Sequence, residues 1–543
     1  MPKAIRSSVR KHRGKVFAAK GSVQGQDFNL GEPIAMAAGI APDIEELNEP
    51  RPGTTSYPVS RELFSKLKEA SISAERLDKS DSTITKDVAK ADFEIATAAP
   101  GTEMAASAFA PFMAPTITYP TASTNFAGIT TKWIPADCTM AVGPDHVLVS
   151  INSSVAIYQK TGNVVLAART LTVWFNNVIQ EATIFDPKAL YDQHSNRWVL
   201  LAVAVNKETK SSWFLLSVSE SSDPLKGWSN YALDATVDGD IKTTNWVDYP
   251  GLGVDTNALY LTGNMFGFGG GFQYAKIRIV PKVDIYEGNA ATFKDLVRLK
   301  DADGSLSFTV QPCHIYGAPQ AQYFINSYFP RTPSAETKLS LWTLTDPLEA
   351  SPTLTLRTIT TDPYNLPPDA VQQGGEVPLE SGDVRVLNAV FRGGSIWCAL
   401  NTQHNWGDDT NVAAIHWFQI EAATGALIQQ GIYGAQNSHY LYPAVMPDNN
   451  GNMVMVFSRC GPTEFASIYF TGRKATDPLG QLQPSSLLLA GAAYYQKLDT
   501  NGRNRWGDYA GIASDPANSG LIWFYGMSAV AGNLWSTWVG SAF

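Results

Sequence analysis

Two stretches far apart in the chain have nearly the same pattern of residues. Residues 245–266 contain Asp-Tyr-Pro-Gly-Leu-Gly-Val-Asp, a polar turn and the run Ala-Leu-Tyr-Leu-Thr, while residues 505–526 contain Asp-Tyr-Ala-Gly-Ile-Ala-Ser-Asp, a similar turn and Leu-Ile-Trp-Phe-Tyr. Each stretch has the pattern of two short strands joined by a turn. A pattern that recurs along a chain indicates an architecture built from one repeated unit, so this repeat constrains the fold more than any local feature.

Further units of this kind can be placed along the chain. Their first residues are Asp137, Asp186, Asp248, Gln311, Val386, Tyr442 and Asp508. An Asp-Pro-Leu turn at Asp223, Asp346 and Asp477 follows a strand-like run in three units, at closely similar distances from the unit start. The pattern therefore predicts that each unit forms four antiparallel strands. It predicts that the whole chain folds as an all-β β-propeller, with seven blades favoured. Six or eight blades stay open, because the first unit is short and residues 362–383 are unassigned.

The sequence divides into two regions. Residues 1–115 are rich in Ala, Ser, Thr and Pro, which predicts an irregular, flexible N-terminal extension with one short helix at 59–70. Residues 116–543 have the short β-branched and aromatic runs of an all-β domain and form the predicted propeller. The last unit lacks an outermost strand, which we expect from the segment ahead of Asp137, at 116–119 or 129–133.

Composition excludes several classes of partner. Hydrophobic residues make up 44% of the chain, charged residues only 17%, and the net charge is -9, so no basic face for a nucleic acid is expected. No apolar run is long enough to span a membrane, and no signal peptide is recognisable, so localisation stays open, with an extracellular or particle-delivered role included. The four widely spaced cysteines predict buried free thiols.

The candidate site follows from strand geometry. In an antiparallel hairpin, the start of the first strand and the end of the second lie at the same end, so their polar residues should converge on one mouth of the propeller. This mouth would hold the candidate catalytic residues Asp137, Asp186, Asp248 and Asp508. The candidate substrate-binding residues are Trp246, Asn264, His314, Asn326, Asn401, His404, Trp406, Arg459 and Arg505. Aromatic rings, amides and charged groups together suit a polyhydroxylated ligand.

These residues allow several chemistries. Glycoside hydrolysis needs two carboxyl groups on either side of the bond, which the four aspartates could supply. Elimination from an acidic sugar needs a base such as His314 and an arginine that holds the carboxylate. Converging carboxylates also favour a hard cation such as Ca²⁺, although no metal ligands can be assigned. The alternative is structural: Asp and Asn at strand starts often satisfy the backbone N–H groups of their own turns.

The blade pattern resembles a group of bacterial propeller proteins related to sialidase-type repeat proteins. The resemblance rests on Asp-Pro-x-x-x-Tyr-Asp at Asp186, Asp-Tyr-Pro-x-Leu-Gly-Val-Asp at Asp248, the Asn-Met-Phe ending at Asn264 and Arg-Trp-Gly-Asp-Tyr at Arg505, and it covers residues 130–543. The sialidase Asp-box, Ser-x-Asp-x-Gly-x-Thr-Trp, is absent in intact form. The resemblance implies the fold and does not fix an activity.

Two functions remain as expectations. The first is a carbohydrate-recognising propeller with a glycan or polysaccharide ligand at the central mouth, acting as a glycoside hydrolase or a polysaccharide lyase. The second is a non-catalytic interaction or adhesion propeller that residues 1–115 tether to a protein partner or larger assembly. The sequence contains no motif that decides whether the protein is an enzyme.

Overall fold

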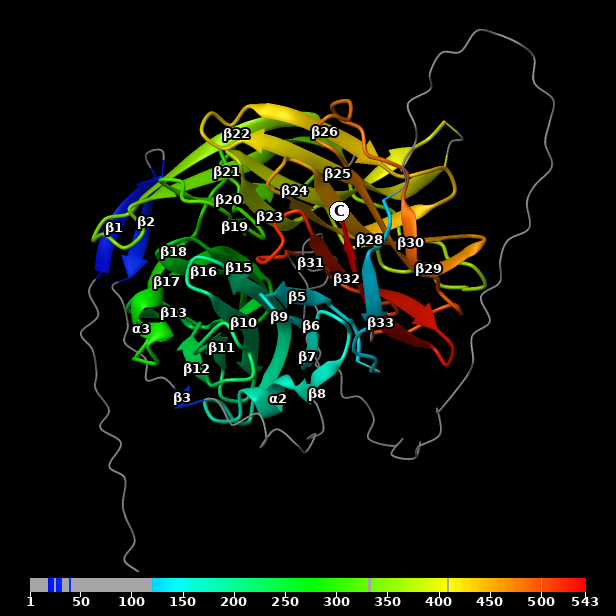
Figure 1. The fold of residues 1–543 in the computed structure, drawn as a ribbon. Coiled ribbons are helices and arrows are strands. Elements are labelled where there is room, and N and C mark those ends of the chain that lie inside the picture. The colour runs from blue at the N-terminus through cyan, green and yellow to red at the C-terminus, as the bar shows by residue number, and fades with distance from the viewer. Residues whose placement is uncertain are drawn as a thin grey trace, which may run out of the picture.

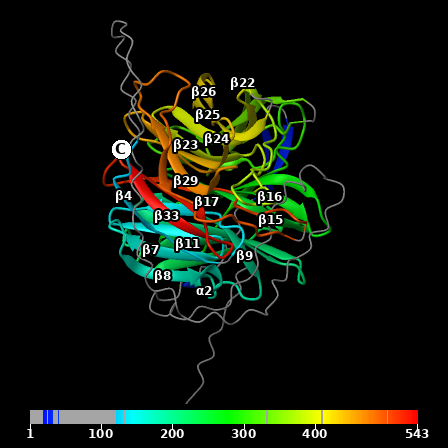
Figure 2. The same ribbon diagram turned by 90° about the vertical axis from the view of Figure 1, so that its right-hand side faces the viewer.

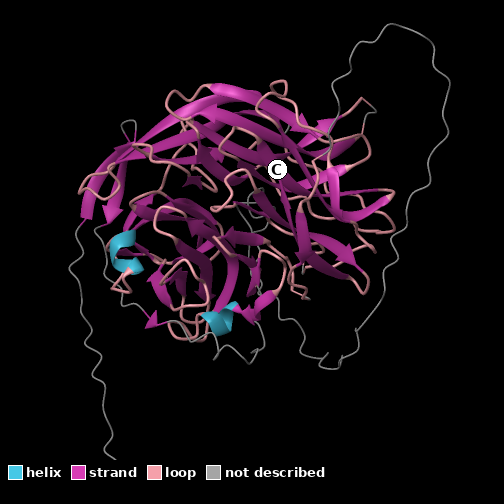
Figure 3. Cartoon of the chain, viewed as in Figure 1, coloured by secondary structure: helices cyan, strands magenta, loops and turns pink. Residues whose placement is uncertain are grey.

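The regular secondary structure of the described residues is almost entirely β-strand. Its computed structural model describes residues 120–543 except 132, 331–333, 408–409 and 500, and ahead of residue 120 it describes only three short strands. Within these described residues the helices are α2 (Leu171–Trp174) and α3 (Lys282–Tyr286), both very short (Figure 3). The predicted all-β class is therefore confirmed.

Most described strands form antiparallel runs of four, in which each strand pairs with the next along the chain. The first three runs contain β5 (Thr139–Val142), β6 (His146–Ile151), β7 (Ser154–Gln159) and β8 (Val164–Thr170); β9 (Thr183–Asp192), β10 (Arg197–Asn206), β11 (Ser211–Ser219) and β12 (Trp228–Asp234); and β15 (Asn245–Val254), β16 (Ala258–Gly267), β17 (Phe272–Pro281) and β18 (Lys294–Val297). The next three contain β19 (Gln311–Ile315), β20 (Gln322–Ser327), β21 (Glu336–Thr345) and β22 (Thr353–Tyr364); β23 (Val386–Arg392), β24 (Ser395–Asn405), β25 (Asn411–Glu421) and β26 (Leu427–Tyr433); and β27 (His439–Pro447), β28 (Met453–Gly461), β29 (Glu464–Arg473) and β30 (Ser486–Leu489). The runs β15–β18, β19–β22 and β23–β26 are joined into one twelve-stranded sheet, and the run β9–β12 gains a fifth strand from the N-terminal region.

The last sheet combines the two ends of the described region. Strands β31 (Gly511–Ser514), β32 (Ile522–Val530) and β33 (Leu534–Ala542) are followed in space by β4 (Thr124–Ala127), which pairs antiparallel with β33 (Figure 2). A strand from ahead of Asp137 was expected here, and it is present. It lies at Thr124–Ala127, so its expected position at 129–133 was wrong, while 116–119 falls outside the described residues.

The first strands of the sheets lie side by side. In the order β5, β9, β15, β19, β23, β27 and β31 each contacts the next, and β31 contacts β5. Parallel bridges join β15 to β19 and β19 to β23, so these strands run in the same direction. Figure 1 shows the first strands near the common centre and the later strands farther out. The starts of the first strands therefore face one end of this centre, and the hairpins that follow them face the other.

Neighbouring sheets cover each other's faces. Strands β10 and β16 are apolar along most of their length instead of alternating, and almost all of their residues are buried. This pattern is expected for a strand that packs on both sides. Val203 of β10, Leu216 of β11 and Leu261 of β16 belong to one apolar cluster, so the sheets are held together by side chains that interdigitate between them.

The N-terminal region contributes a few strands to the described structure. Strands β1 (Ala18–Val23) and β2 (Gln26–Gly31) pair with each other, and β3 (Gly39–Ile40) pairs with the outer edge of β12. A further small hairpin is formed by β13 (Val237–Asp238) and β14 (Ile241–Lys242). The predicted helix at 59–70 lies outside the described residues. None of the helices that are described has the length and hydropathy needed to cross a membrane.

Candidate functional site

The four candidate aspartates meet at the centre of the molecule. Asp137 and Asp508 lie just ahead of β5 and β31, and Asp186 and Asp248 lie near the starts of β9 and β15. The backbone N–H of Asp508 donates to Asp137 Oδ1 over 2.8 Å, and the carboxyl groups of Asp186 and Asp248 are hydrogen-bonded to each other. All four residues are buried. The structure thus brings them together, but beneath the surface instead of on the wall of an open mouth.

Local backbone conformation turns these residues inward. Asp137 and Asp186 themselves have φ of 46° and 51°, and Tyr249, which follows Asp248, has φ of 50°. The ladders of β9 and β15 shift register at these positions, as in a β-bulge. Positive φ is uncommon for residues other than Gly, with Asn and Asp the most tolerant. The Asp-rich pattern at strand starts is therefore explained in part by the backbone.

Burial controls the protonation of the aspartates. Loss of water, together with the nearby charges of Asp508 and Asp186, raises the pKa of Asp137 well above its usual range. Burial and the neighbouring charge of Asp248 raise the pKa of Asp186 likewise, and burial raises the pKa of Asp248 to about 8. Carboxyl groups this close together cannot all ionise in a dry interior. At neutral pH the pair Asp186 and Asp248 therefore retains protons.

Cations offset the remaining negative charge. Lys188 lies with its ammonium 3.0 Å from the ring centre of Tyr509 and 5.5 Å from that of Tyr249, and burial lowers the pKa of Lys188 to about 7. Arg505 donates to both oxygens of Asp508, at 3.1 and 3.0 Å, and it also pairs with Glu380. These aromatic and ionic contacts fill the centre next to the aspartates.

This donor set does not fit a calcium ion. One oxygen of Asp137 accepts from Asn152 Nδ2 at 2.7 Å and the other from the backbone of Asp508, while Asp508 is paired with Arg505. Calcium requires several free oxygen ligands around one point. In the part of the chain that the structure describes, no group of three or more His, Cys, Asp or Glu residues is arranged to hold a metal ion.

Three asparagines at the ends of second strands tie one sheet to the next. Asn264 donates to Thr309 Oγ1 and accepts from the Thr309 backbone N–H, both over 2.8 Å. Asn401 accepts in the same way from the backbone of Tyr442 at 2.9 Å. Asn152, which links to Asp137, also accepts from the backbone of Asp186 at 3.1 Å. Thr309, Tyr442 and Asp186 all have positive φ, so each asparagine fixes the bend at which the following sheet begins.

The other candidate binding residues are distributed more widely. Asn326 is buried and bonds to Asp301 and to the indole of Trp342, and Trp246 is buried among aromatic rings. His404 and Trp406 lie together, with ring centres 4.3 Å apart, just where β24 ends. Arg459 of β28 forms an ion pair with Glu464 at 2.8 Å and lies over the Tyr469 ring. Of all the candidates, His314 is the one that lines a cavity at the opposite end of the centre.

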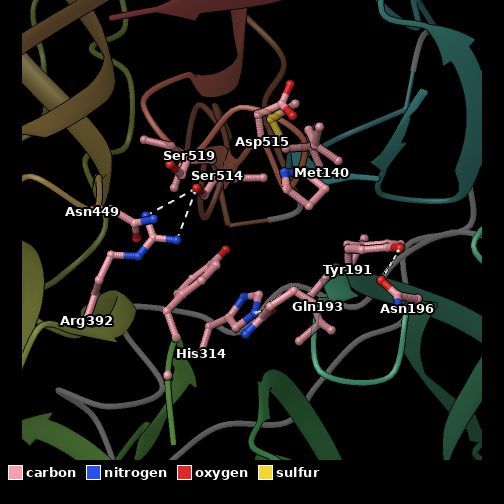
Figure 4. Close-up of a pocket in the computed structure, with 18 residues that line it drawn as sticks. Met140, Tyr191, Gln193, Asn196, His314, Arg392, Asn449, Ser514, Asp515 and Ser519 are labelled. Carbon is pink, nitrogen blue, oxygen red and sulfur yellow. Dashed lines mark hydrogen bonds between the residues drawn. The ribbon is translucent and has the colours of Figure 1, made fainter. Parts of the chain in front are cut away.

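A cavity of about 320 Å³ opens at the opposite end of the centre, where the hairpins follow the first strands. Its polar wall includes Tyr191, Gln193 and Asn196 after β9, His314 and Tyr316 at β19, Arg392 at the end of β23, Asn449 after β27, and Ser514, Asp515 and Ser519 after β31. Figure 4 shows these side chains reaching the hollow from separate elements. The volume lies at the lower end of the range of small-molecule sites.

Hydrogen bonds and stacking hold this wall in place. Gln193 Oε1 lies 2.9 Å from His314 Nε2, and Gln193 Nε2 donates to the carbonyl of Ile315 at 2.7 Å. The rings of His314 and Tyr316 stack 4.4 Å apart, and the guanidinium of Arg392 lies 3.7 Å from the Tyr316 ring centre. Burial, together with the neighbouring His194, lowers the pKa of His314 to about 3. His314 is therefore neutral at physiological pH.

Sequence reasoning missed most of this cavity. Gln193, Tyr316, Arg392 and Ser514 follow the apolar part of their first strands directly, just as the aspartates precede it. A search for polar residues at both ends of each first strand would have found them. The four cysteines, Cys138, Cys313, Cys398 and Cys460, are buried free thiols, as predicted.

Comparisons with known proteins give a likeness of fold alone. No family model matches the sequence, and no curated protein is significantly similar to it. Similar solved structures include the Dos1 propeller (9% identity, TM-score 0.34, 77% of this chain and 94% of that one) and a GH93 α-L-arabinofuranosidase of Fusarium graminearum (6%, 0.32, 77% and 97%). A sialidase of Trypanosoma rangeli is also similar (9%, 0.31, 76% and 60%). At these values the likeness assigns neither a family nor a ligand.

Proposed function

We propose that the protein is a seven-bladed β-propeller that recognises a carbohydrate in the cavity at the hairpin end of its axis. The seven blades would correspond to the seven antiparallel runs of four strands among the described residues, with β4 as the outer strand of the last blade. Contact between β31 and β5 supports closure of the ring. The short outer pairing of β4 with β33 would join the two ends of the propeller.

The lining of the cavity carries this proposal. Tyr191 borders the hollow with an aromatic ring, on which sugar rings pack, and Asn196 and Asn449 offer amides that both donate to and accept from hydroxyl groups. The wall comes from the hairpins of several sheets, which is where a rigid scaffold can present binding residues. Recognition of a small polyhydroxylated ligand is the function that this lining fits best.

Hydrolysis receives less support than binding. A glycosidase needs two carboxyl groups beside the bond that it cleaves. Among the described residues that line the cavity, Asp515 is the one with a carboxyl group. This group forms an ion pair with Lys160 at 2.8 Å and accepts a hydrogen bond from the indole of Trp523 at 2.9 Å. The four central aspartates are buried, and Asp508 borders only a hole of about 10 Å³. We assign these aspartates to holding the axis together.

Elimination from an acidic sugar is a second candidate. It is supported by one juxtaposition, that of neutral His314, Tyr316 and Arg392 on the same wall. A neutral imidazole or a tyrosine could remove a proton while the arginine holds the carboxylate. Tethering to a protein partner through residues 1–115 stays a prediction, because that region lies almost entirely outside the described residues.

A saccharide screen with a blocked cavity tests the proposal. Binding of neutral and acidic mono- and oligosaccharides would be measured by calorimetry on the full chain. Ser519→Trp should abolish binding because it places a large ring at an exposed position on the cavity wall, whereas Ser351→Trp, at an exposed turn between β21 and β22, should leave it unchanged. Binding that survives Ser519→Trp would refute the site. Release of an unsaturated product, detected by its ultraviolet absorbance, would favour elimination.

A further inference from the structure

The imidazole of His314 is held by one of its nitrogens and by one of its faces. Nε2 lies 2.9 Å from Oε1 of Gln193, and the ring stacks on Tyr316 with the ring centres 4.4 Å apart. Among the described residues Nδ1 has no hydrogen-bond partner, and it does not belong to the buried side-chain atoms that lack one. Nδ1 therefore reaches open space, and the open space that His314 borders is the cavity (Figure 4).

The amide of Gln193 can take only one orientation. Its nitrogen donates to the backbone carbonyl of Ile315 at 2.7 Å, and a carbonyl oxygen can only accept. With the amide reversed, two oxygens would face each other at that distance with no hydrogen between them. His194 Nε2 lies 2.9 Å from the same carbonyl oxygen and from the Gln193 nitrogen, and it can donate to the first or accept from the second without turning the amide. The Ile315 carbonyl therefore directs the oxygen of Gln193 toward His314.

This orientation fixes the tautomer of His314 through its hydrogen-bond network. Because Oε1 of Gln193 can only accept, Nε2 of His314 carries a hydrogen and donates it. Burial and the nearby His194 disfavour a second proton on the ring and lower the pKa of His314 to about 3, so the ring is neutral. In a neutral imidazole with a hydrogen on Nε2, the lone pair of Nδ1 is a hydrogen-bond acceptor. The cavity wall thus contains an acceptor that no described residue uses.

The direction of this acceptor is fixed as well. A half-turn of the His314 ring would place a carbon atom beside Oε1 of Gln193 and remove the hydrogen bond between them. The stack on Tyr316 holds the plane of the ring, and Tyr316 is itself packed against the guanidinium of Arg392, which lies 3.7 Å from the Tyr316 ring centre. An acceptor held in this way accepts a hydrogen from one direction, which is the condition for selective recognition.

We infer that His314 Nδ1 is a specificity-determining acceptor of this cavity, and that the ligand is a sugar that donates one free hydroxyl group to it. Gln193 is a positioning residue, since it acts on the ligand only through His314. This inference rests on the proposed function and deepens it by naming the group that the cavity recognises. A hydroxyl group satisfies the acceptor, whereas a methylene group at the same place leaves it without a hydrogen. The cavity thus distinguishes a sugar from one of its deoxy derivatives.

The tautomer can be measured on the full chain without a ligand. Long-range ¹H–¹⁵N correlation spectra of protein with labelled histidine distinguish the two ring nitrogens, and His314→Phe, which keeps an aromatic ring against Tyr316, identifies the His314 signal. The wild type should show a hydrogen on Nε2, and Gln193→Leu should show a mixture of both tautomers. The control Gln273→Leu removes an exposed glutamine that also donates to a carbonyl but lies outside the cavity, and it should leave the signal unchanged. A hydrogen on Nδ1 in the wild type would overturn the inference.

Deoxy sugars test the role of His314 in binding. Calorimetry with glucose, galactose, mannose, xylose and arabinose selects the tightest binder, which is then compared with each of its monodeoxy derivatives. Loss of one hydroxyl group should weaken binding to the wild type about ten- to a hundredfold and should make little difference in His314→Phe. An equal loss in both proteins, with circular dichroism of the variant like that of the wild type, would overturn the inference and leave carbohydrate recognition standing. Absence of binding by all these sugars would overturn the proposed function together with the ligand, whichever tautomer is found.

Discussion

Substitution of Asp248 by Asn should stabilise the protein at neutral pH. The Asp248 carboxyl group is buried, accepts from the Tyr249 backbone N–H at 2.8 Å and is bonded to Asp186. Its pKa is raised by burial from 3.8 to about 8. Asn is neutral and nearly the same in shape, so it can keep both hydrogen bonds without an ionisation step.

The stabilising effect of Asp248→Asn and its dependence on pH follow from proton linkage. Between pH 4 and pH 8 the unfolded chain has released the Asp248 proton and the folded protein still holds it, so stability of the wild type decreases as pH rises. Each pH unit corresponds to about 1.4 kcal/mol. The free energy of unfolding of Asp248→Asn should therefore be nearly equal to that of the wild type at pH 4. At pH 7 it should exceed the wild-type value by about 4 kcal/mol at most. Above pH 8 the difference should level off.

Urea unfolding followed by tryptophan fluorescence measures this difference across the pH range. Asp223→Asn, which changes an aspartate that accepts from Leu225 in an outer turn, provides a control with no expected pH-dependent difference of this size. Asp248→Ala should be less stable than Asp248→Asn, because the Tyr249 N–H loses its acceptor. If Asp248→Asn were destabilising at pH 7 and its curve ran parallel to that of the wild type, the buried carboxyl would have to be ionised and the reasoning would be refuted.

Three other perturbations test the way in which the sheets are joined. Asn264→Ala removes both hydrogen bonds to Thr309 and should cost about 2–4 kcal/mol in urea unfolding; a loss below about 0.5 kcal/mol would contradict its role as a link between sheets. Arg505→Gln removes the ion pair of the buried Asp508 and one of the two ion pairs of Glu380, and should cost about 3–5 kcal/mol, while unchanged stability would contradict the buried ion pairs. Deletion of residues 1–128 removes β4 and exposes the edge of β33, so light scattering should detect self-association; a stable monomer would argue against β4 as the closing strand.

Much of the fold could be read from the sequence because it is specified locally. The Asp-Tyr-Pro-Gly-Leu-Gly-Val-Asp pattern at residues 248–255 indicated a first strand, and β15 is found there. Alternation, turn residues and strand length depend on neighbours along the chain, so a single sequence carries this information. Convergence of Asp137, Asp186, Asp248 and Asp508 also followed from strand direction.

The depth of these residues and the position of the cavity were decided by packing between sheets. Lys188 lies over the ring of Tyr509 and near that of Tyr249, which come from distant parts of the chain, and these side chains fill the centre next to the aspartates. Arg392 is ordinary in sequence; its place beside Tyr316 and Ser514 on the cavity wall is decided by contacts between distant strands. The sequence by itself therefore determined the strands and the end of the axis at which the acids gather, while long-range contacts decided which end is open.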